Sequence, residues 1–142
     1  VTLPMSARHL ALFHTAIDDA MAAAALAMLA AVGRGRLPFR AAIGVAIELY
    51  EFTGEKAHYI QSAITNADGR TDQPLIGGRP LPIGRYELRF AIGNHFRSRG
   101  IASGDPPFLD VVPLRFSIAE PEGHYHVPLL CTPWSYSTYR GS

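Results

Sequence analysis

The stretch Gly84-Arg-Tyr-Glu-Leu-Arg-Phe-Ala-Ile92 alternates between apolar side chains and charged or small ones. A period of two residues is typical of a β-strand, because successive side chains point to opposite faces of a sheet. Tyr86, Leu88, Phe90 and Ile92 are therefore expected to share one face, with the arginines and the glutamate on the other. The stretch predicts a strand with one face on a core, as in antiparallel sheets.

Other segments on both sides of this stretch have the same period or the same short, turn-bounded length: 45–49, 59–65, 112–118, 124–130 and 135–139. The turn Asn66-Ala-Asp-Gly69 ends the second of them. Because proline donates no ladder hydrogen bond, Pro113 indicates that the third either lies at a sheet edge or starts after this residue. Segment 97–107 contains two glycines and two prolines, which indicates a loop, with a short helix as the alternative. This pattern predicts an all-β antiparallel sandwich with one short helix.

The composition changes near Gly33, which divides the 142 residues into two parts. Residues 1–33 are an atypical, alanine-rich segment in which alanine favours a helix, and residues 34–142 are the sandwich domain. The apolar run 20–32 is shorter than the roughly 20 residues that a membrane span needs. It resembles the apolar part of a secretory signal, but Asp18 and Asp19 precede it where positive charge is expected. We expect a cytoplasmic protein, or a periplasmic one if the run is a signal.

The overall composition narrows the function classes. Apolar residues make up 48% and charged residues 18%, which is typical of a globular chain. A formal net charge of +1 gives no reason to expect nucleic acid or a membrane surface as partner. Cys131 is the single cysteine, so no internal disulfide can form, and we interpret it as a buried apolar residue.

The candidate chemistry lies in His124-Tyr-His126 and in the segment that follows it. On a strand, His124 and His126 share one face, whereas Tyr125, Val127 and Leu129 point to the core. Two ligands are too few for a metal site, although the spacing suits one; a structural pair is the other interpretation. If the last two strands form a hairpin, His126 can line one surface with Tyr139 and Ser137.

Several motifs resemble those of 5-hydroxyisourate hydrolases, which have a transthyretin-like (prealbumin-like) sandwich. The endings His124-Tyr-His-Val-Pro-Leu-Leu130 and Pro133-Trp-Ser-Tyr-Ser-Thr-Tyr-Arg-Gly-Ser142 match the family's closing signature. The final Tyr-Arg-Gly-Ser separates these enzymes from transthyretin, the hormone carrier. Thr65-Asn-Ala-Asp-Gly-Arg70 and Gly84-Arg-Tyr-Glu-Leu-Arg-Phe90 are also similar. The resemblance extends over residues 43–142.

The resemblance implies an assembly and a site. The family suggests a homotetramer, a dimer of dimers, with substrate sites in a channel between the dimers. It implies catalytic roles for His126 and Arg70 and substrate contacts for Arg70, Tyr139 and Ser137. It implies no cofactor and no metal, because the substrate is already an activated acyl compound.

The chain departs from the family in its first strand, which normally carries a catalytic histidine. Counting back from Gly35-Arg-Leu-Pro38 places that histidine within residues 28–32, where there is none. The nearest similar sequence is Phe13-His-Thr-Ala-Ile-Asp-Asp19, so His14 is a candidate catalytic residue only if an alanine-rich insertion follows. Loss of this histidine, with weakened catalysis, is the other interpretation.

The function expected from the resemblance is hydrolysis of 5-hydroxyisourate to 2-oxo-4-hydroxy-4-carboxy-5-ureidoimidazoline, a step of urate degradation in purine metabolism. One alternative is a transthyretin-like protein that binds a small ligand with little or no turnover, and the missing first-strand histidine favours it. Another is a plain sandwich with a structural or interaction role. The intact ending of the chain's sequence favours the enzyme.

Overall fold

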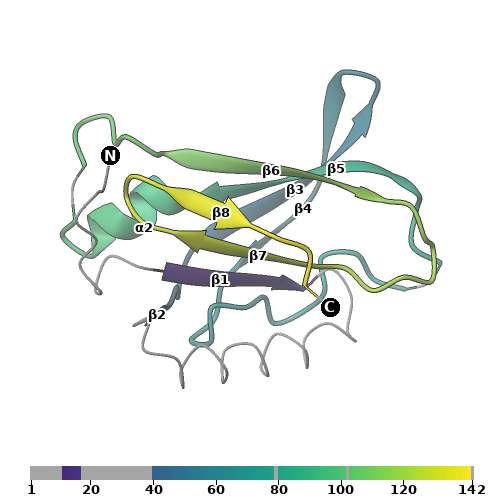
Figure 1. The fold of residues 1–142 in the computed structure, drawn as a ribbon, viewed down its shortest axis with the longest axis horizontal. Helices are drawn as coiled ribbons and strands as arrows, with labels where there is room; N and C mark the ends of the chain where they lie inside the picture. Colours follow the sequence, from purple (N-terminus) through teal and green to yellow (C-terminus); the bar gives the residue numbers. More distant parts are fainter. Residues whose placement is uncertain (1–10, 17–39, 79, 102, 142) are drawn as a thin grey trace.

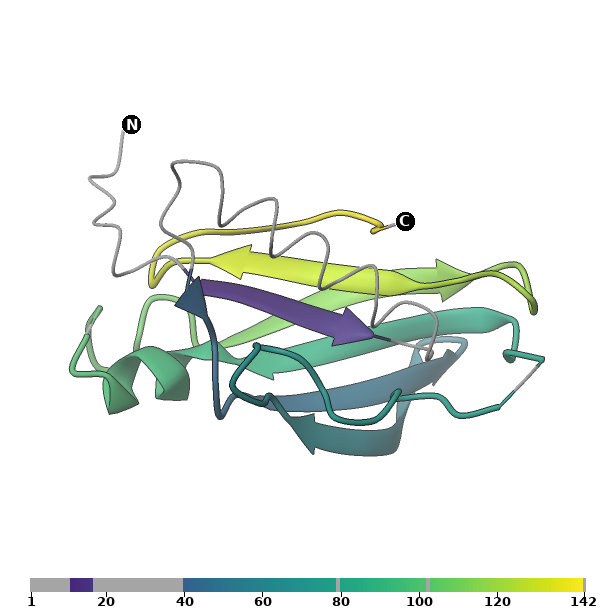
Figure 2. The ribbon, with the colours of Figure 1, turned by 90° about the horizontal axis from the view of Figure 1, so that it is seen from below.

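Two sheets of mostly antiparallel strands make up the fold (Figures 1 and 2). The computed structural model describes residues 11–16, 40–78, 80–101 and 103–141. In this part of the chain, one sheet has the order β2-β1-β7-β8 and the other the order β4-β3-β5-β6. The strands of the first sheet are β1 (Ala11–Ala16), β2 (Arg40–Ala41), β7 (His126–Cys131) and β8 (Tyr136–Thr138). Those of the second are β3 (Ala46–Thr53), β4 (Lys56–Ile64), β5 (Gly84–Ala91) and β6 (Val111–Ile118).

The second sheet follows the alternation of the sequence. Tyr86, Leu88 and Phe90 of β5 are buried, and β5 pairs with β3 on one side and β6 on the other. The prediction from Pro113 is confirmed, since β6 is an edge strand. The all-β sandwich is therefore the observed fold, with a core between the two sheets.

The first sheet contains the predicted hairpin of the last two strands. In the pairing of β7 with β8, Leu130 lies opposite Ser137. As expected, Val127 and Leu129 are buried on the core face of β7, and Cys131 is buried with them. Burial in these apolar surroundings raises the pKa of the Cys131 thiol, which is therefore protonated at neutral pH.

The short helix of the described residues begins earlier in the chain than the alternation predicted. Helix α2 (Ile92–Ser98) begins at Ile92, which was expected to be the last strand position, and sits at one end of the sandwich (Figure 1). Ile92 is nevertheless fully buried. Gly93 explains the early turn, because a Cβ there would meet the Asp110 carboxylate at 2.7 Å. Close approach of this kind depends on a distant segment, so periodicity does not predict it.

Most of the alanine-rich segment 1–33 lies outside the described residues, including the run 20–32 and positions 28–32. The part that is described is β1, which pairs in antiparallel fashion with β7 and in parallel with β2. The division at Gly33 and the signal interpretation stay predictions. Among the described residues there is no helix with the length and apolar character of a membrane span.

Candidate active site

His126 opens strand β7 and is almost fully buried, with 1% of its surface exposed. The chain after β8 turns back toward the start of β7 (Figure 1, yellow). There the Gly141 amide donates a hydrogen bond of 2.8 Å to the His126 carbonyl, and the two residues form a β-bridge. The C-terminal segment thus covers the histidine.

The register places the tyrosine of this segment beside the histidine. Leu130 pairs with Ser137, and His126 bridges Gly141 with the same offset. Alternation then puts positions 137, 139 and 141 on the face of the sheet that carries position 126. Tyr139 is partly exposed, at 39%, and partial burial raises the pKa of its hydroxyl. The phenol is therefore a hydrogen-bond donor at neutral pH.

A cleft of about 270 Å³ opens between the free edges of the two sheets. Its walls come from residues 114–117 of β6, from 125–127 and from 138–140. His126 and Tyr139 both line it, whereas Arg70 and Ser137 do not. The lining is largely apolar, with a few polar groups, as in many sites for small planar molecules.

Arg70 approaches His126 from the turn after β4. The Asn66 side chain accepts hydrogen bonds from the backbone amides of Asp68 (2.9 Å) and Arg70 (3.2 Å), and Gly69 adopts φ = 72°. This confirms the predicted turn. After this turn, the guanidinium atom Nη1 of Arg70 is buried and has no hydrogen-bond partner within the described part of the chain. A buried donor without a partner is costly and often marks a functional site.

Burial and the Arg70 charge together lower the pKa of His126 from 6.5 to about 4. Burial disfavours the charged imidazolium, and the nearby positive charge disfavours it further. The imidazole is therefore neutral at pH 7 and able to accept a proton. The structure thus combines a neutral base with a guanidinium that has an unused donor.

The other predicted residues occupy different positions. Ser137 lies on β8 and is exposed. His124 precedes β7 and is also exposed, so the two histidines of the HxH pattern do not form a buried pair. His14 lies in β1 opposite Pro128, two residues from His126 along β7. Among the described residues, no group of three histidine, cysteine or acidic side chains gathers where it can hold a metal ion.

Two residues of the ending had no role assigned from the sequence. Arg140 donates a hydrogen bond of 3.1 Å to the His124 carbonyl and lies 4.5 Å from the centre of the Tyr125 ring. Gly141 lies against the His126 ring, where a side chain has no room. A glycine near the end of a strand often marks such a close approach, and this signal was available in the sequence.

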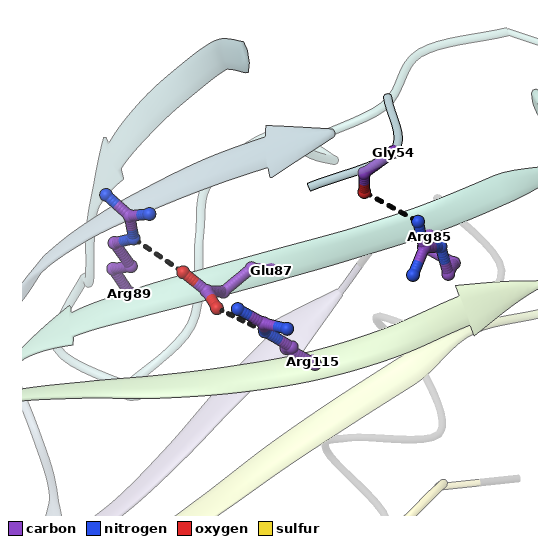
Figure 3. Close-up of polar contacts among 5 residues, drawn as sticks. All are labelled: Gly54, Arg85, Glu87, Arg89 and Arg115. Atoms are coloured by element: carbon purple, nitrogen blue, oxygen red, sulfur yellow. Dashed lines mark hydrogen bonds and ion pairs between the residues drawn. The ribbon is translucent and has the colours of Figure 1, made fainter. Parts of the chain in front are cut away.

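A second buried charge lies on the outer face of the other sheet. Glu87 of β5 accepts hydrogen bonds from Arg89 (2.6 Å) and Arg115 (2.9 Å), as Figure 3 shows. Burial raises the pKa of Glu87, but the hydrogen bonds and charges of the two arginines outweigh it, and the net pKa is lowered. Every formal charge in this cluster has a partner, so we interpret it as structural.

The fold defines a transthyretin-like sandwich protein, with a candidate small-molecule site beside its C-terminal segment. The chain belongs to the HIUase/Transthyretin family, whose model matches residues 37–141. It is 52% identical to 5-hydroxyisourate hydrolase 2 of Rhizobium meliloti (strain 1021) over 103 residues, which are 72% of this chain and 86% of that protein. It is 54% identical to the 5-hydroxyisourate hydrolase of Deinococcus radiodurans over 71% of this chain and 84% of that protein.

A solved structure extends the similarity to more of the chain. The Klebsiella pneumoniae 5-hydroxyisourate hydrolase has a TM-score of 0.60 and 27% identity. The match covers 92% of this chain and 99% of that one. The predicted family and its sandwich fold are therefore confirmed.

Proposed function

We propose that this protein is a hydrolase that converts 5-hydroxyisourate to 2-oxo-4-hydroxy-4-carboxy-5-ureidoimidazoline in urate degradation. The observation that carries the proposal is the buried, neutral His126 next to the Arg70 charge. Relatives that are about half identical over seven tenths of the chain, and that are named 5-hydroxyisourate hydrolases, support the same activity.

The reaction adds water across an acyl C–N bond and opens the six-membered ring. His126 accepts a proton from the attacking water, whose oxygen bonds to the carbonyl carbon. Negative charge then builds on the carbonyl oxygen, and the free donor of Arg70 offsets it. The proton returns to the ring nitrogen as the C–N bond breaks. Neutral His126 is suited to both proton transfers at neutral pH.

Tyr139 orients the substrate from the wall of the cleft, where its hydroxyl donates a hydrogen bond. Ser137 lies outside the cleft lining, on the same face of the sheet as Tyr139, and contacts the part of the ligand that extends beyond the cleft. The register supports this arrangement, because positions 137 and 139 are two residues apart and therefore share a face. Conversion of Tyr139 to phenylalanine then weakens substrate binding more than it slows the chemical step.

His14 supplies the second histidine of the site in this proposal. Position 14 lies opposite position 128, so by register it belongs to the face of the sheet that carries position 126. Sequence spacing alone placed the first-strand histidine within residues 28–32. If β1 is the first strand instead, position 14 is the place of that histidine. A lower kcat/KM for His14→Gln, without loss of fold, supports the assignment, and an unchanged kcat/KM removes it.

The active form is a homotetramer in this proposal. Tyr136 and Tyr139 remain 44% and 39% exposed on or beside the free edge strand β8. Large exposed side chains on a free edge support pairing with another copy. Light scattering coupled to size exclusion checks the mass, and a monomer at micromolar concentration removes this part of the proposal.

The test of the activity is the decay of freshly prepared 5-hydroxyisourate, followed by its ultraviolet absorbance. The protein should accelerate decay strongly, and His126→Gln should lower kcat/KM about 1,000-fold, the scale of a lost general base. His58→Gln is the matched control, because His58 is exposed on β4 of the opposite sheet. Decay no faster than in buffer would instead favour a ligand-binding protein without turnover.

A further inference from the structure

The glycine of the ending Tyr139-Arg-Gly-Ser142 lies directly against the imidazole of His126. A Cβ placed on Gly141 would collide with Nδ1 of the ring and would lie 2.9 Å from Cγ and 3.1 Å from Cε1. Real Cβ atoms almost never come within 3.0 Å of another heavy atom. An aromatic ring is rigid, so any side chain at position 141 requires either the ring or the main chain to move.

The main chain at this point is held and cannot simply move away. The Gly141 amide is bonded to the His126 carbonyl, and Arg140 is bonded to the His124 carbonyl. Slightly earlier, the Thr138 hydroxyl donates a hydrogen bond of 2.7 Å to the Pro128 carbonyl. Thr138, Arg140 and Gly141 therefore attach the C-terminal segment to β7 and to the residue two positions before it.

The ring is confined as well. His126 is 1% exposed, so packed neighbouring atoms restrict rotation of its ring, although the residue also borders the cleft. Gly141 covers the edge of the ring that carries Nδ1. The contact thus joins the C-terminal segment to a buried side chain at the start of β7.

We propose that Gly141 is a positioning residue, whose bare main chain fixes the orientation of the His126 ring and covers the edge of the ring that carries Nδ1. The inference rests on the proposed function, since it makes Gly141 act through the catalytic base. Gly141 itself does not touch the reacting atoms. A side chain at this position would either break the hydrogen bonds of the C-terminal segment or turn the His126 ring. In this proposal, catalysis depends on the hydrogen bonds and on the ring orientation.

The first test is a double-mutant cycle on thermal stability, and it does not depend on turnover. Gly141→Ala should lower Tm by about 5 °C, the usual scale of overpacking in a domain of this size. In a His126→Ala background the ring is absent, and the same change should lower Tm by less than about 1 °C. Gly77→Ala is the matched control, because a Cβ at Gly77 meets nothing within 4 Å.

The second test measures whether the contact between Gly141 and His126 affects catalysis. Gly141→Ala should lower kcat/KM about 100-fold, the scale of a misplaced catalytic group. Loss of cover should also raise the pKa of His126 from about 4 toward 6.5, as measured by NMR titration of the ring. Gly77→Ala should change neither quantity.

Three outcomes would overturn the inference. They are a stability loss that is the same with and without the His126 ring, an unchanged pKa of His126 in Gly141→Ala, and an unchanged kcat/KM. Failure of the proposed function has a different signature: the wild-type protein would not hydrolyse 5-hydroxyisourate, while the coupling between positions 141 and 126 would remain measurable.

Discussion

Each of the two sheets buries a charged or titratable side chain, and the two side chains differ in how completely their surroundings are paired. On the outer face of β5, Glu87 has two arginine partners, and each arginine also lies over an aromatic ring. At the start of β7, His126 lies next to Arg70, whose atom Nη1 has no hydrogen-bond partner. Every charge of the first cluster has a partner of opposite charge. The second cluster combines a neutral base with a donor that makes no hydrogen bond.

This difference separates stability from function. A fully paired cluster lowers the free energy of the folded chain and leaves no buried donor without a partner. An unpaired buried donor raises that free energy, and a structure retains it where binding or catalysis uses the donor. Burial of a charge is therefore a weak sign of function until its partners are counted.

Among the substitutions that test this comparison, removal of the Arg70 guanidinium should have the largest effect on kcat/KM. Arg70→Met should lower kcat/KM by about 100- to 1,000-fold, the usual loss for one donor to a developing oxyanion. The free energy of unfolding in urea should stay the same or rise, because a buried donor without a partner disappears.

Arg89→Met is the control for this change. It removes a guanidinium that is bonded to Glu87, so it should lower the free energy of unfolding and leave kcat/KM unchanged. Equal losses of stability in the two variants would contradict the distinction between a paired and an unpaired arginine.

Acid should destabilise the two clusters in different pH ranges. The folded pKa of His126 is about 4 and its ordinary value is 6.5, so between these values the unfolded chain binds the proton more readily. The free energy of unfolding should therefore fall as pH drops from 6.5 toward 4, by up to about 3 kcal/mol for one such histidine. Buried His95 in α2, also with a pKa of about 4, adds a similar loss.

Glu87 should contribute only at lower pH. Its ordinary pKa is 4.5 and its folded value is lower, so its stabilisation is present above 4.5 and is lost below it. Urea unfolding of the wild type and of His126→Gln at pH 7, 5.5 and 4.5 measures the first range. If His126→Gln keeps the full dependence on pH above 4.5, the histidine is not the group responsible.

The smallest effect is expected for the paired cluster itself. Glu87→Gln keeps the shape of the side chain and removes its charge, so we expect a loss of about 1–2 kcal/mol in the free energy of unfolding. The partly exposed side chains of Arg89 and Arg115 limit the loss. kcat/KM should remain within about twofold of the wild type, and a larger drop would link this face to the site.

The alternation of residues predicted β3, β5 and β6 well because each of these strands has one face on the core, whereas β4 is exposed over most of its length. It was wrong at Ile92, where a close approach to Asp110 turns the chain into α2. The shorter strands of the first sheet carry less periodic information. Pairing of β1 with β7 joins residues more than a hundred positions apart, which a local pattern cannot specify.

The candidate site, too, was predicted in part from the sequence and in part only seen in the structure. Motif resemblance selected His126, Arg70 and Tyr139, and the structure brings His126 to each of the other two. The resemblance did not indicate that His124 would be exposed, or that Gly141 would lie against the ring. Those facts depend on the return of the C-terminal segment to the start of β7.

By itself, the sequence determined the period of the strands, the turn before Arg70 and the membership of a family, because these depend on residues close together in the chain. The tertiary structure decided which polar groups are paired and which histidine is buried. Desolvation and nearby charge set a pKa, and both arise only when distant segments pack together. His126 is an ordinary histidine in the sequence and a neutral, covered base in the folded chain.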